Sequence, residues 1–350
     1  MGFARTAVTV ALLALVPQLL DRVLLFPGVP VHAEGGVLVT GASSGIGLHA
    51  AIAIGARGYV AFAGVRKQAD ADALRAAAHP NVVPVLLDVT QPAQVAEAAR
   101  AVRSELARRG GAKLVGLVNN AGVGRSLPIE VHALADVRAV FDVNVFGVYA
   151  ATQAFLPLLR EAGGGARIVN IGSVAGFMST AAGGTYSATK HALEAISDAL
   201  RRELAPPGSG PAGSISVSLV EPAFVQSAIH GKQQAAGVPE AASRRYGALL
   251  AKNAALAATN TPLASPPDVT TGAIADALFS AFPRTRYVVA NVGGIPAVVV
   301  KAMWWLFPDR LLDLVLGGGS ADPKITTAVL VGGIGAAVAI TRRALDAVGL

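Results

Sequence analysis

Three side chains in the middle of the chain could together move a proton: Ser173, Tyr186 and Lys190. Tyr186 and Lys190 are four residues apart, so on a helix they share one face. A free phenol has a pKa of about 10, and a neighbouring ammonium lowers that pKa by favouring the phenolate. Tyr186 could then exchange a proton with a substrate oxygen that the Ser173 hydroxyl holds. On spacing alone, a core tyrosine beside a solvated lysine is the simpler interpretation, because this spacing also arises by chance.

A glycine-rich stretch nearer the start of the chain suits a phosphate. It reads Thr40-Gly41-Ala42-Ser43-Ser44-Gly45-Ile46-Gly47, and it lies between a short apolar run and a predicted helix. Glycines let the backbone turn tightly and approach a pyrophosphate, while the helix N-terminus offers free N–H groups. Such a loop can also be a mere turn, but its place between strand and helix favours dinucleotide binding.

Two polar positions extend this cofactor hypothesis to other strand ends. Asp88 ends a predicted strand, where its carboxylate could accept a hydrogen bond from an adenine amino group. It could equally cap the helix that follows Pro92. Asn119-Asn120-Ala121-Gly122 ends the next strand, and open α/β sheets bind ligands at the carboxyl ends of their strands. The alternative for this stretch is a turn built from common turn residues.

The end of the second predicted strand bears on which dinucleotide would bind. NAD-binding folds often place an acid there to bind the ribose hydroxyls. This chain instead has Gly64-Val65-Arg66-Lys67, with no carboxylate to repel a 2′-phosphate and two cations to pair with one. The sequence therefore favours NADP over NAD, and ordinary surface charge is the alternative.

The elements that must position these residues alternate between strand and helix. Short apolar runs bounded by turn residues predict strands at 37–40, 59–65, 82–87, 114–118, 167–171, 215–220 and 287–290. Helices are predicted at 46–56, 69–78, 92–109, 134–160 as one helix or two, 186–204 and 268–281. This alternation predicts an α/β fold, a doubly wound parallel sheet of Rossmann type in a single domain spanning 35–292. Within it, 223–268 is a Pro- and Ala-rich insertion without clear periodicity.

The segment before this domain, residues 1–34, is apolar. Ala7–Val16 is an uninterrupted apolar run, short for a full membrane span of about 20 residues. An uncleaved membrane anchor would explain it. So would a signal peptide cleaved near Val31-His32-Ala33, or a helix packed on the domain.

The segment after the domain, residues 293–350, is apolar again. Its stretch 298–316, with Trp304-Trp305 and scattered charges, suits an interfacial amphipathic helix. Ile325–Thr341 carries no charge, which is near the lower limit of length for a spanning helix. A dimer interface or a helix packed on the domain is the alternative. We expect one of the terminal segments to contact a membrane.

Composition narrows the class of function further. The net charge is +7, but lysines and arginines are scattered and aromatics are few, so a nucleic-acid groove is not expected. A basic surface would also favour anionic lipids or a phosphorylated cofactor. The absence of cysteine excludes disulfides, thiolate catalysis and cysteine-ligated metals. The six histidines show no paired spacing, so no metal site is expected.

In their order and separations, these motifs resemble the short-chain dehydrogenase/reductase family. The resemblance covers about residues 36–225, and its pieces are TGASSGIG at 40–47, Asp88, NNAG at 119–122, Asn144, Ser173 and YSATK at 186–190. It implies that Tyr186 is the acid/base, and that Lys190 lowers its pKa and holds the nicotinamide ribose. It further implies that Ser173 orients the substrate oxygen and that Asn144 holds a water for proton relay. The hydride would pass directly between nicotinamide and substrate carbon.

The cofactor-binding positions follow from the motifs and the resemblance together. They are Thr40, Gly41, Ser43, Ser44, Gly45, Ile46, Gly47, Arg66, Lys67, Asp88, Val89, Asn120, Ala121, Gly122, Tyr186, Lys190, Pro222, Ala223, Phe224 and Val225. The chain departs from the family after the sixth strand. Pro222 is followed by Ala223 where the family usually has glycine, and Ser227 replaces an expected threonine. These changes leave the contact with the nicotinamide carboxamide open.

The stretches at 61–66 and 220–224 look like those of members that act on steroids and retinoids. We therefore expect an NAD(P)-dependent oxidoreductase for a lipophilic alcohol or carbonyl compound of the steroid, retinoid or lipid kind. Its pocket would be lined by apolar and aromatic residues of the insertion: Phe224, Ile229, Tyr246, Leu249 and Leu250.

Alternatives remain for the function and its place in the cell. One is a soluble reductase of a small carbonyl or acyl substrate. Another is a non-catalytic NADP-binding sensor or scaffold, which the intact set of Asn144, Ser173, Tyr186 and Lys190 disfavours. We expect membrane association, with the endoplasmic reticulum as one candidate compartment, a cytoplasmic protein as the alternative, and a homodimer as a further expectation.

Overall fold

The computed structural model describes residues 28–77, 80–204, 214–226 and 237–316. Contacts divide the described chain into a unit that ends at Gly294 and a second unit that starts at Ile295. The first unit contains every predicted catalytic and cofactor-binding residue. The predicted apolar runs at 7–16 and 325–341, and Ile229 of the predicted pocket, lie outside the described residues.

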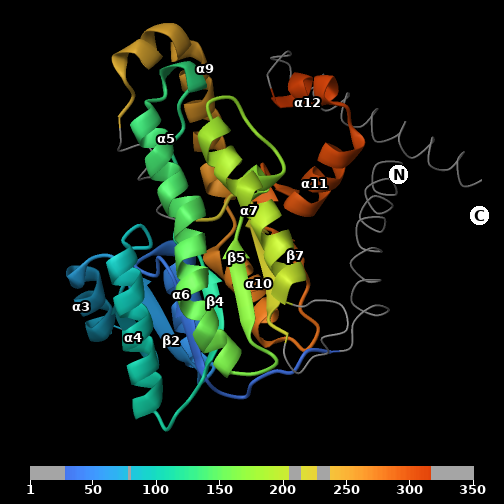
Figure 1. The fold of residues 1–350 in the computed structure, drawn as a ribbon. Helices are drawn as coiled ribbons and strands as arrows, with labels where there is room; N and C mark the ends of the chain where they lie inside the picture. The colour runs from blue at the N-terminus through green and yellow to red at the C-terminus, as the bar shows by residue number, and fades with distance from the viewer. Residues whose placement is uncertain (1–27, 78–79, 205–213, 227–236, 317–350) are drawn as a thin grey trace, which may run out of the picture. The chain divides into compact units, whose positions relative to one another are not determined.

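Seven strands form one sheet in the order β3-β2-β1-β4-β5-β6-β7, and every neighbouring pair is parallel (Figure 1). The strands are β1 (Gly36–Val39), β2 (Val60–Val65), β3 (Val82–Leu86), β4 (Leu114–Asn119), β5 (Arg167–Ile171), β6 (Ser216–Pro222) and β7 (Arg286–Val289). Their order reverses between β1 and β4, which is where doubly wound sheets bind ligands. The predicted Rossmann-type α/β fold is therefore confirmed.

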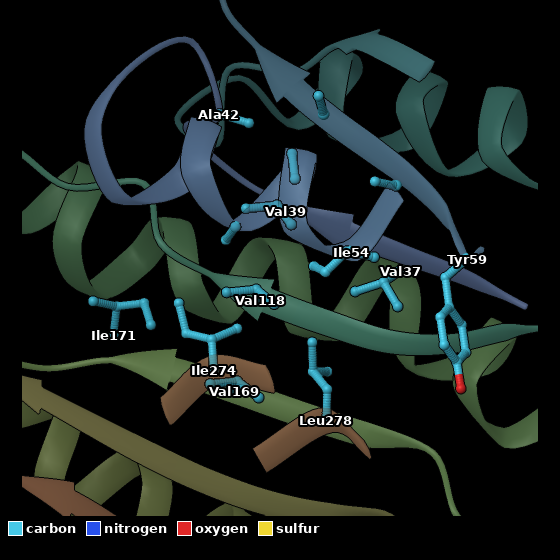
Figure 2. Close-up of a cluster of buried hydrophobic side chains, with 14 of the residues drawn as sticks. Val37, Val39, Ala42, Ile54, Tyr59, Val118, Val169, Ile171, Ile274 and Leu278 are labelled. Atoms are coloured by element: carbon cyan, nitrogen blue, oxygen red, sulfur yellow. The ribbon is translucent and has the colours of Figure 1, made fainter. Parts of the chain in front are cut away.

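Helices cover both faces of the sheet, so most strand residues are buried and apolar. One face carries α2 (Gly45–Ala56), α3 (Gln68–Ala77) and α10 (Pro267–Phe279). The other carries α4 (Pro92–Arg108), α6 (Gly147–Glu161) and α7 (Gly184–Leu204). Figure 2 shows the first of these layers, in which Ile54 of α2 and Leu278 of α10 pack with strand residues such as Val37.

Further elements complete the first unit. They are η1 (Ile129–Val131), α5 (Leu134–Phe141), the π-helical turn η2 (Asp142–Phe146), η3 (Val174–Gly176), α9 (Glu240–Asn260), η5 (Thr261–Leu263) and β8 (Asn291–Val292). In the second unit, the elements described are β9 (Ile295–Pro296), α11 (Ala297–Leu306) and α12 (Asp309–Leu316).

Among the described residues, one helix is long and apolar enough to cross a membrane, namely Leu134–Glu161. It is the continuous run of α5, η2 and α6. Phe155 and Leu159 on this run are fully buried in the core that it forms with β4 and α4. The apolar residues on the buried side of this run are therefore explained by their place in the domain core.

Two elements differ from the sequence-based expectation. The insertion 223–268 contains the 21-residue helix α9. Its periodicity is hidden because most of its residues are alanines or exposed polar groups, and only Ala242 and Asn260 are buried. The predicted interfacial helix at 298–316 is two helices, α11 and α12. Pro308 accounts for the break, because proline cannot donate the backbone bond that would continue α11.

Residues 29–32, assigned from the sequence to the N-terminal segment, are bonded to the sheet domain. The backbone N–H of Val29 donates to the carbonyl of Ala281 at 2.7 Å. Arg167, which is 1% exposed, donates to the carbonyl of Pro30 at 3.0 Å. The phenol of Tyr59 donates to the carbonyl of His32. This stretch is therefore part of the folded domain.

Candidate active site

The glycine-rich loop turns between β1 and α2, as the sequence predicts. Gly41 has a φ of +66°, a conformation that only glycine adopts readily. A Cβ added to Gly47 would lie 2.4 Å from Nδ2 of Asn120 and 2.5 Å from the carbonyl oxygen of Gly41. The side chain of Ser44, the N-cap of α2, makes no capping bond. The first N–H groups of α2 therefore remain available to an anion.

The NNAG stretch closes the other side of this loop. The side-chain amide of Asn120 donates to the carbonyls of Thr40 at 2.9 Å and Gly41 at 3.1 Å. The Thr40 hydroxyl accepts from the backbone N–H groups of Asn120 and Ala121, both at 3.0 Å. These bonds hold the two predicted cofactor segments against each other at the carboxyl ends of β1 and β4.

The predicted adenine contact, Asp88, lies just after the end of β3. The carboxylate of Asp88 accepts from the backbone N–H and the hydroxyl of Thr90 at 3.0 and 2.7 Å. It does not cap α4, whose N-cap is Gln91. The alternative role as a helix cap is therefore wrong. Val89 is buried.

The predicted ribose-phosphate contacts follow β2. Arg66 and Lys67 are both exposed, and neither makes an ion pair with a described residue. The backbone N–H of Ala42 donates to the carbonyl of Gly64 at 2.8 Å. This bond holds the glycine loop beside the end of β2, and Arg66 and Lys67 follow that strand end directly in the sequence.

The end of β6 and the segment after it contain the last four predicted cofactor contacts. Pro222 ends β6, and the N–H of Ala223 donates to the carbonyl of Val289 at 3.0 Å. Phe224 and Val225 form isolated bridges with Asn291 and Ser265. The predicted contact residue Pro222 also accepts a 3.4 Å bond from the Ser173 hydroxyl through its carbonyl. Ser227 lies outside the described residues.

Tyr186, Lys190 and Ser173 are brought together as predicted. Tyr186 and Lys190 lie on successive turns of α7, with Nζ of Lys190 5.6 Å from the centre of the Tyr186 ring. Ser173 follows β5, and its hydroxyl lies near enough to the Tyr186 phenol to lower the pKa of that phenol. The ammonium of Lys190 donates to the carbonyl of Ile171 at 2.8 Å. A phenol, a hydroxyl and an ammonium thus share one small region at the sheet edge.

The pKa of Tyr186 differs from the sequence-based expectation. Desolvation raises the pKa of the phenol, and the hydrogen bond with Ser173 lowers it in part. Burial also lowers the pKa of Lys190 to about 8. The expected lowering of the Tyr186 pKa by Lys190 is therefore not found, and loss of water around the phenol sets the direction of the shift. The phenol is protonated at neutral pH, which suits donation of a proton to a carbonyl oxygen.

Asn144 lies in the π-helical turn between α5 and α6, where π-helical turns often mark functional sites. Its Oδ1 accepts from the N–H of Val123 at 2.9 Å, and its Nδ2 donates to the carbonyl of Val123 and the hydroxyl of Thr189. A Cβ added to Gly122 would lie 3.5 Å from Oδ1 of Asn144 and 3.9 Å from Nζ of Lys190. Asn144 and Lys190 therefore converge on the NNAG loop, as a relay requires.

One participant was missed from the sequence. The Thr189 hydroxyl donates to the carbonyl of Tyr186 at 2.7 Å and accepts from Asn144 at 3.0 Å. It thereby links the π-helical turn to the turn that carries Tyr186. Its position three residues after Tyr186, on the same helix face, was a signal that could have found it.

The comparisons with known proteins agree with this geometry. Residues 36–237 match the family model described as "short chain dehydrogenase". The chain belongs to the short-chain dehydrogenase/reductase family. It is accordingly an oxidoreductase that acts on an alcohol or carbonyl group with NAD(P), as predicted.

Two of the curated relatives cover most of the chain. The chain is 34% identical to an "NADPH-dependent 3-dehydrocapnine reductase" of Ornithobacterium rhinotracheale, covering 79% of this chain and 94% of the relative. It is 34% identical to "Retinol dehydrogenase 5" of Mus musculus, covering 80% of this chain and 87% of the relative.

Solved structures of the family are similar as well. A short chain dehydrogenase/reductase from Burkholderia phymatum in complex with NAD aligns with a TM-score of 0.64 and 28% identity, covering 84% of this chain and 99% of that one. A short chain dehydrogenase from Burkholderia cenocepacia in complex with NADP aligns with a TM-score of 0.58 and 25% identity, covering 81% and 97%.

The site of this short-chain dehydrogenase/reductase fits a dinucleotide. Gly41 and Gly47 leave a cradle that a Cβ would fill, and the start of α2 offers N–H groups to the diphosphate. When bound, NAD(P) supplies the hydride donor or acceptor. In such a reaction the Ser173 hydroxyl would hold the substrate oxygen and the Tyr186 phenol would exchange a proton with it, with the charge of Lys190 beside that phenol.

Proposed function

We propose that this enzyme interconverts a lipophilic alcohol and its ketone or aldehyde, that it prefers NADP, and that it works at a membrane. The proposal separates into substrate, cofactor and location. Each part is supported by a different feature of the described chain.

The substrate class rests on the side of α9 that is hydrogen-bonded to η1 and to the loop before α7. The Tyr246 phenol donates to the carboxylate of Glu130 in η1, and Asn253 donates to the carbonyl of Ala181 at 3.0 Å. Leu249 and Leu250 lie four and three residues before Asn253, on the helical stretch after the kink at Tyr246, so both lie on the side that Asn253 anchors. Both are half-buried. Ala181 lies five residues before Tyr186. An apolar helix face beside the catalytic tyrosine favours an apolar substrate.

The names of the relatives support the same class. One is named for retinol and another for dehydrocapnine, and both are about one third identical to this chain over most of its length. The second of these names also specifies NADPH. For this chain, NADP preference is supported by the exposed Arg66 and Lys67 after β2, which offer two cations where an acid would favour NAD.

Retention of the N-terminal segment supports a membrane location. Cleavage after Ala33 would remove the carbonyls of Pro30 and His32, which accept from the buried Arg167 and from Tyr59. Loss of such acceptors leaves buried donors unsatisfied, at a cost of about 1–3 kcal/mol each. We therefore infer that the apolar run stays attached as an anchor. The intact mass of protein purified from membranes should include residues 1–33, and a mass starting at Glu34 would refute retention.

The substrate class can be tested by turnover. Purified enzyme is offered NADPH with retinaldehyde, androstanedione or diacetyl, the last being a small water-soluble ketone. We expect kcat/KM for one of the two lipophilic carbonyls to exceed that for diacetyl by at least about 100-fold, since two buried leucine-sized contacts are worth about 3 kcal/mol or more. Equal or better turnover of diacetyl would show that the substrate is small and polar.

Variants connect this result to α9. Leu249→Gln together with Leu250→Gln should raise KM for the lipophilic carbonyl and leave that for diacetyl unchanged. Leu256→Gln is the matched control, because Leu256 lies on the same helix but is 56% exposed. If the control raises KM as much as the double variant, the assignment of the substrate-facing side of α9 is wrong.

A further inference from the structure

A second pair of bonded side chains holds the turn of α7 that carries Tyr186. His132 follows η1 directly and is 7% exposed. Its Nδ1 lies 2.9 Å from Oγ1 of Thr185, which is 8% exposed. Thr185 is the residue immediately before Tyr186. The bond therefore ties the first turn of α7 to the segment that leads into α5.

The first turn of α7 needs such a tie. The chain enters the helix through Ala182, whose φ of 63° is a left-handed conformation that is costly for a residue other than glycine. From one side, the turn is held by Thr189, whose hydroxyl donates to the carbonyl of Tyr186 and accepts from Asn144. His132 provides a second link through Thr185. Tyr186 thus lies between two cross-links from different elements.

The environment of His132 keeps its ring neutral. Burial lowers its pKa, with Asp136 of α5 opposing and Arg125 of the loop after β4 adding to that effect. Its Nε2 is buried and has no hydrogen-bond partner among the described residues. Buried polar atoms are usually satisfied, and an exception asks for an explanation. Within the described part of the chain, the bond with Thr185 is the one side-chain hydrogen bond of this ring.

We propose that His132, acting through Thr185, is a positioning residue that fixes the Tyr186 phenol against Ser173 for proton transfer. The inference rests on the proposed carbonyl reduction. His132 does not touch the reacting atoms, so its loss should lower kcat and leave cofactor affinity intact. A misplacement of a catalytic group by about 1 Å can cost about 100-fold in rate. We expect a fall in kcat of about 10- to 100-fold when the link is broken.

Four single variants and one double variant test this link. His132→Ala and Thr185→Val remove the bond, whereas His132→Asn and Thr185→Ser keep a group that can make it. Turnover is measured with NADPH and retinaldehyde, NADPH binding by fluorescence, and folding by the thermal midpoint. We expect His132→Ala and Thr185→Val to lower kcat while NADPH affinity stays within about twofold of wild type. His132→Asn and Thr185→Ser should keep most of the wild-type kcat. His132→Ala combined with Thr185→Val should be no worse than either alone, because both break one interaction.

Unchanged kcat in His132→Ala, or losses that multiply in the double variant, would overturn the proposal. So would a loss of kcat matched by an equal loss of NADPH affinity and a collapsed thermal midpoint, because that pattern indicates a purely structural role.

A second readout needs no substrate. The ionisation of Tyr186 is followed by ultraviolet absorbance as the pH is raised. For each variant, the absorbance of the same variant carrying Tyr186→Phe is subtracted, so that only the signal of Tyr186 remains. Loosening of the turn lets water reach the phenol, so the raised pKa of Tyr186 should fall in His132→Ala and stay in His132→Asn. A wild type inactive on retinaldehyde would speak against the proposed substrate class alone. An identical Tyr186 titration in all variants would refute positioning by His132.

Discussion

Replacement of Gly47 by alanine tests the close approach on which the cofactor cradle depends. A Cβ there would lie 2.4 Å from Nδ2 of Asn120 and 2.5 Å from the carbonyl of Gly41. The second neighbour is backbone, so it cannot rotate away. The added methyl must therefore displace Asn120 and weaken its bonds to the carbonyls of Thr40 and Gly41.

The magnitude follows from three contributions. Overpacking costs about 1–3 kcal/mol, and two weakened hydrogen bonds cost about 1 kcal/mol each. Alanine in a helix regains about 1 kcal/mol relative to glycine. The net loss is about 3 kcal/mol of unfolding free energy. Gly272 of α10 is the matched control, because it is also helical and nothing lies within 4 Å of its added Cβ. Gly272→Ala should stabilise by about 0.5–1 kcal/mol.

Urea unfolding and NADPH fluorescence titration measure both effects. Gly47→Ala should unfold at clearly lower urea than Gly272→Ala and bind NADPH at least about tenfold more weakly, while Gly272→Ala binds like wild type. If Gly47→Ala equals the control in both assays, the close packing of the glycine loop on the NNAG stretch is wrong.

Two further predictions concern charge. Arg66→Glu should raise the Kd for NADPH by about tenfold or more and leave the Kd for NADH unchanged, since charge-assisted hydrogen bonds are worth about 1.5–3 kcal/mol. Arg57→Glu is the control, because Arg57 lies before β2, at the other end of that strand. If fluorescence titrations show equal effects of the two variants on NADPH binding, the NADP preference is wrong. Burial lowers the pKa of Lys190 to about 8, so its positive charge is present below that pH and lost above it. kcat/KM for carbonyl reduction should fall as pH rises through about 8, and a rate that is flat to pH 10 would contradict this.

The order and positions of the strands were predictable because the strands are buried on both faces. Each therefore appears as a short apolar run bounded by turn residues, as at Val60–Val65 and Leu114–Asn119. Helix boundaries also agreed within about two residues where proline or glycine marks them, as at Pro92. The cofactor motifs could be found because they occur at strand ends, and Tyr186 and Lys190 because their spacing places them on one face of a helix.

Other features could not be read because they depend on tertiary surroundings. The alanines of α9 favour a helix but carry no periodic signal, and its anchoring by Tyr246 and Asn253 is visible only in the fold. The pKa of Tyr186 depends on how much water the phenol loses, which the spacing to Lys190 does not reveal. The pairing of His132 with Thr185 joins residues 53 positions apart, and neither belongs to a motif.

The central claim is that the Tyr186 phenol delivers the proton while the cofactor supplies the hydride. The most direct test is NADPH turnover by wild type and Tyr186→Phe, with the carbonyl that wild type reduces fastest. General acid catalysis contributes about 10²–10⁴-fold, so the phenylalanine variant should bind NADPH with wild-type affinity and lose turnover by at least about 100-fold. A variant that binds NADPH normally and still turns over at the wild-type rate would contradict the account.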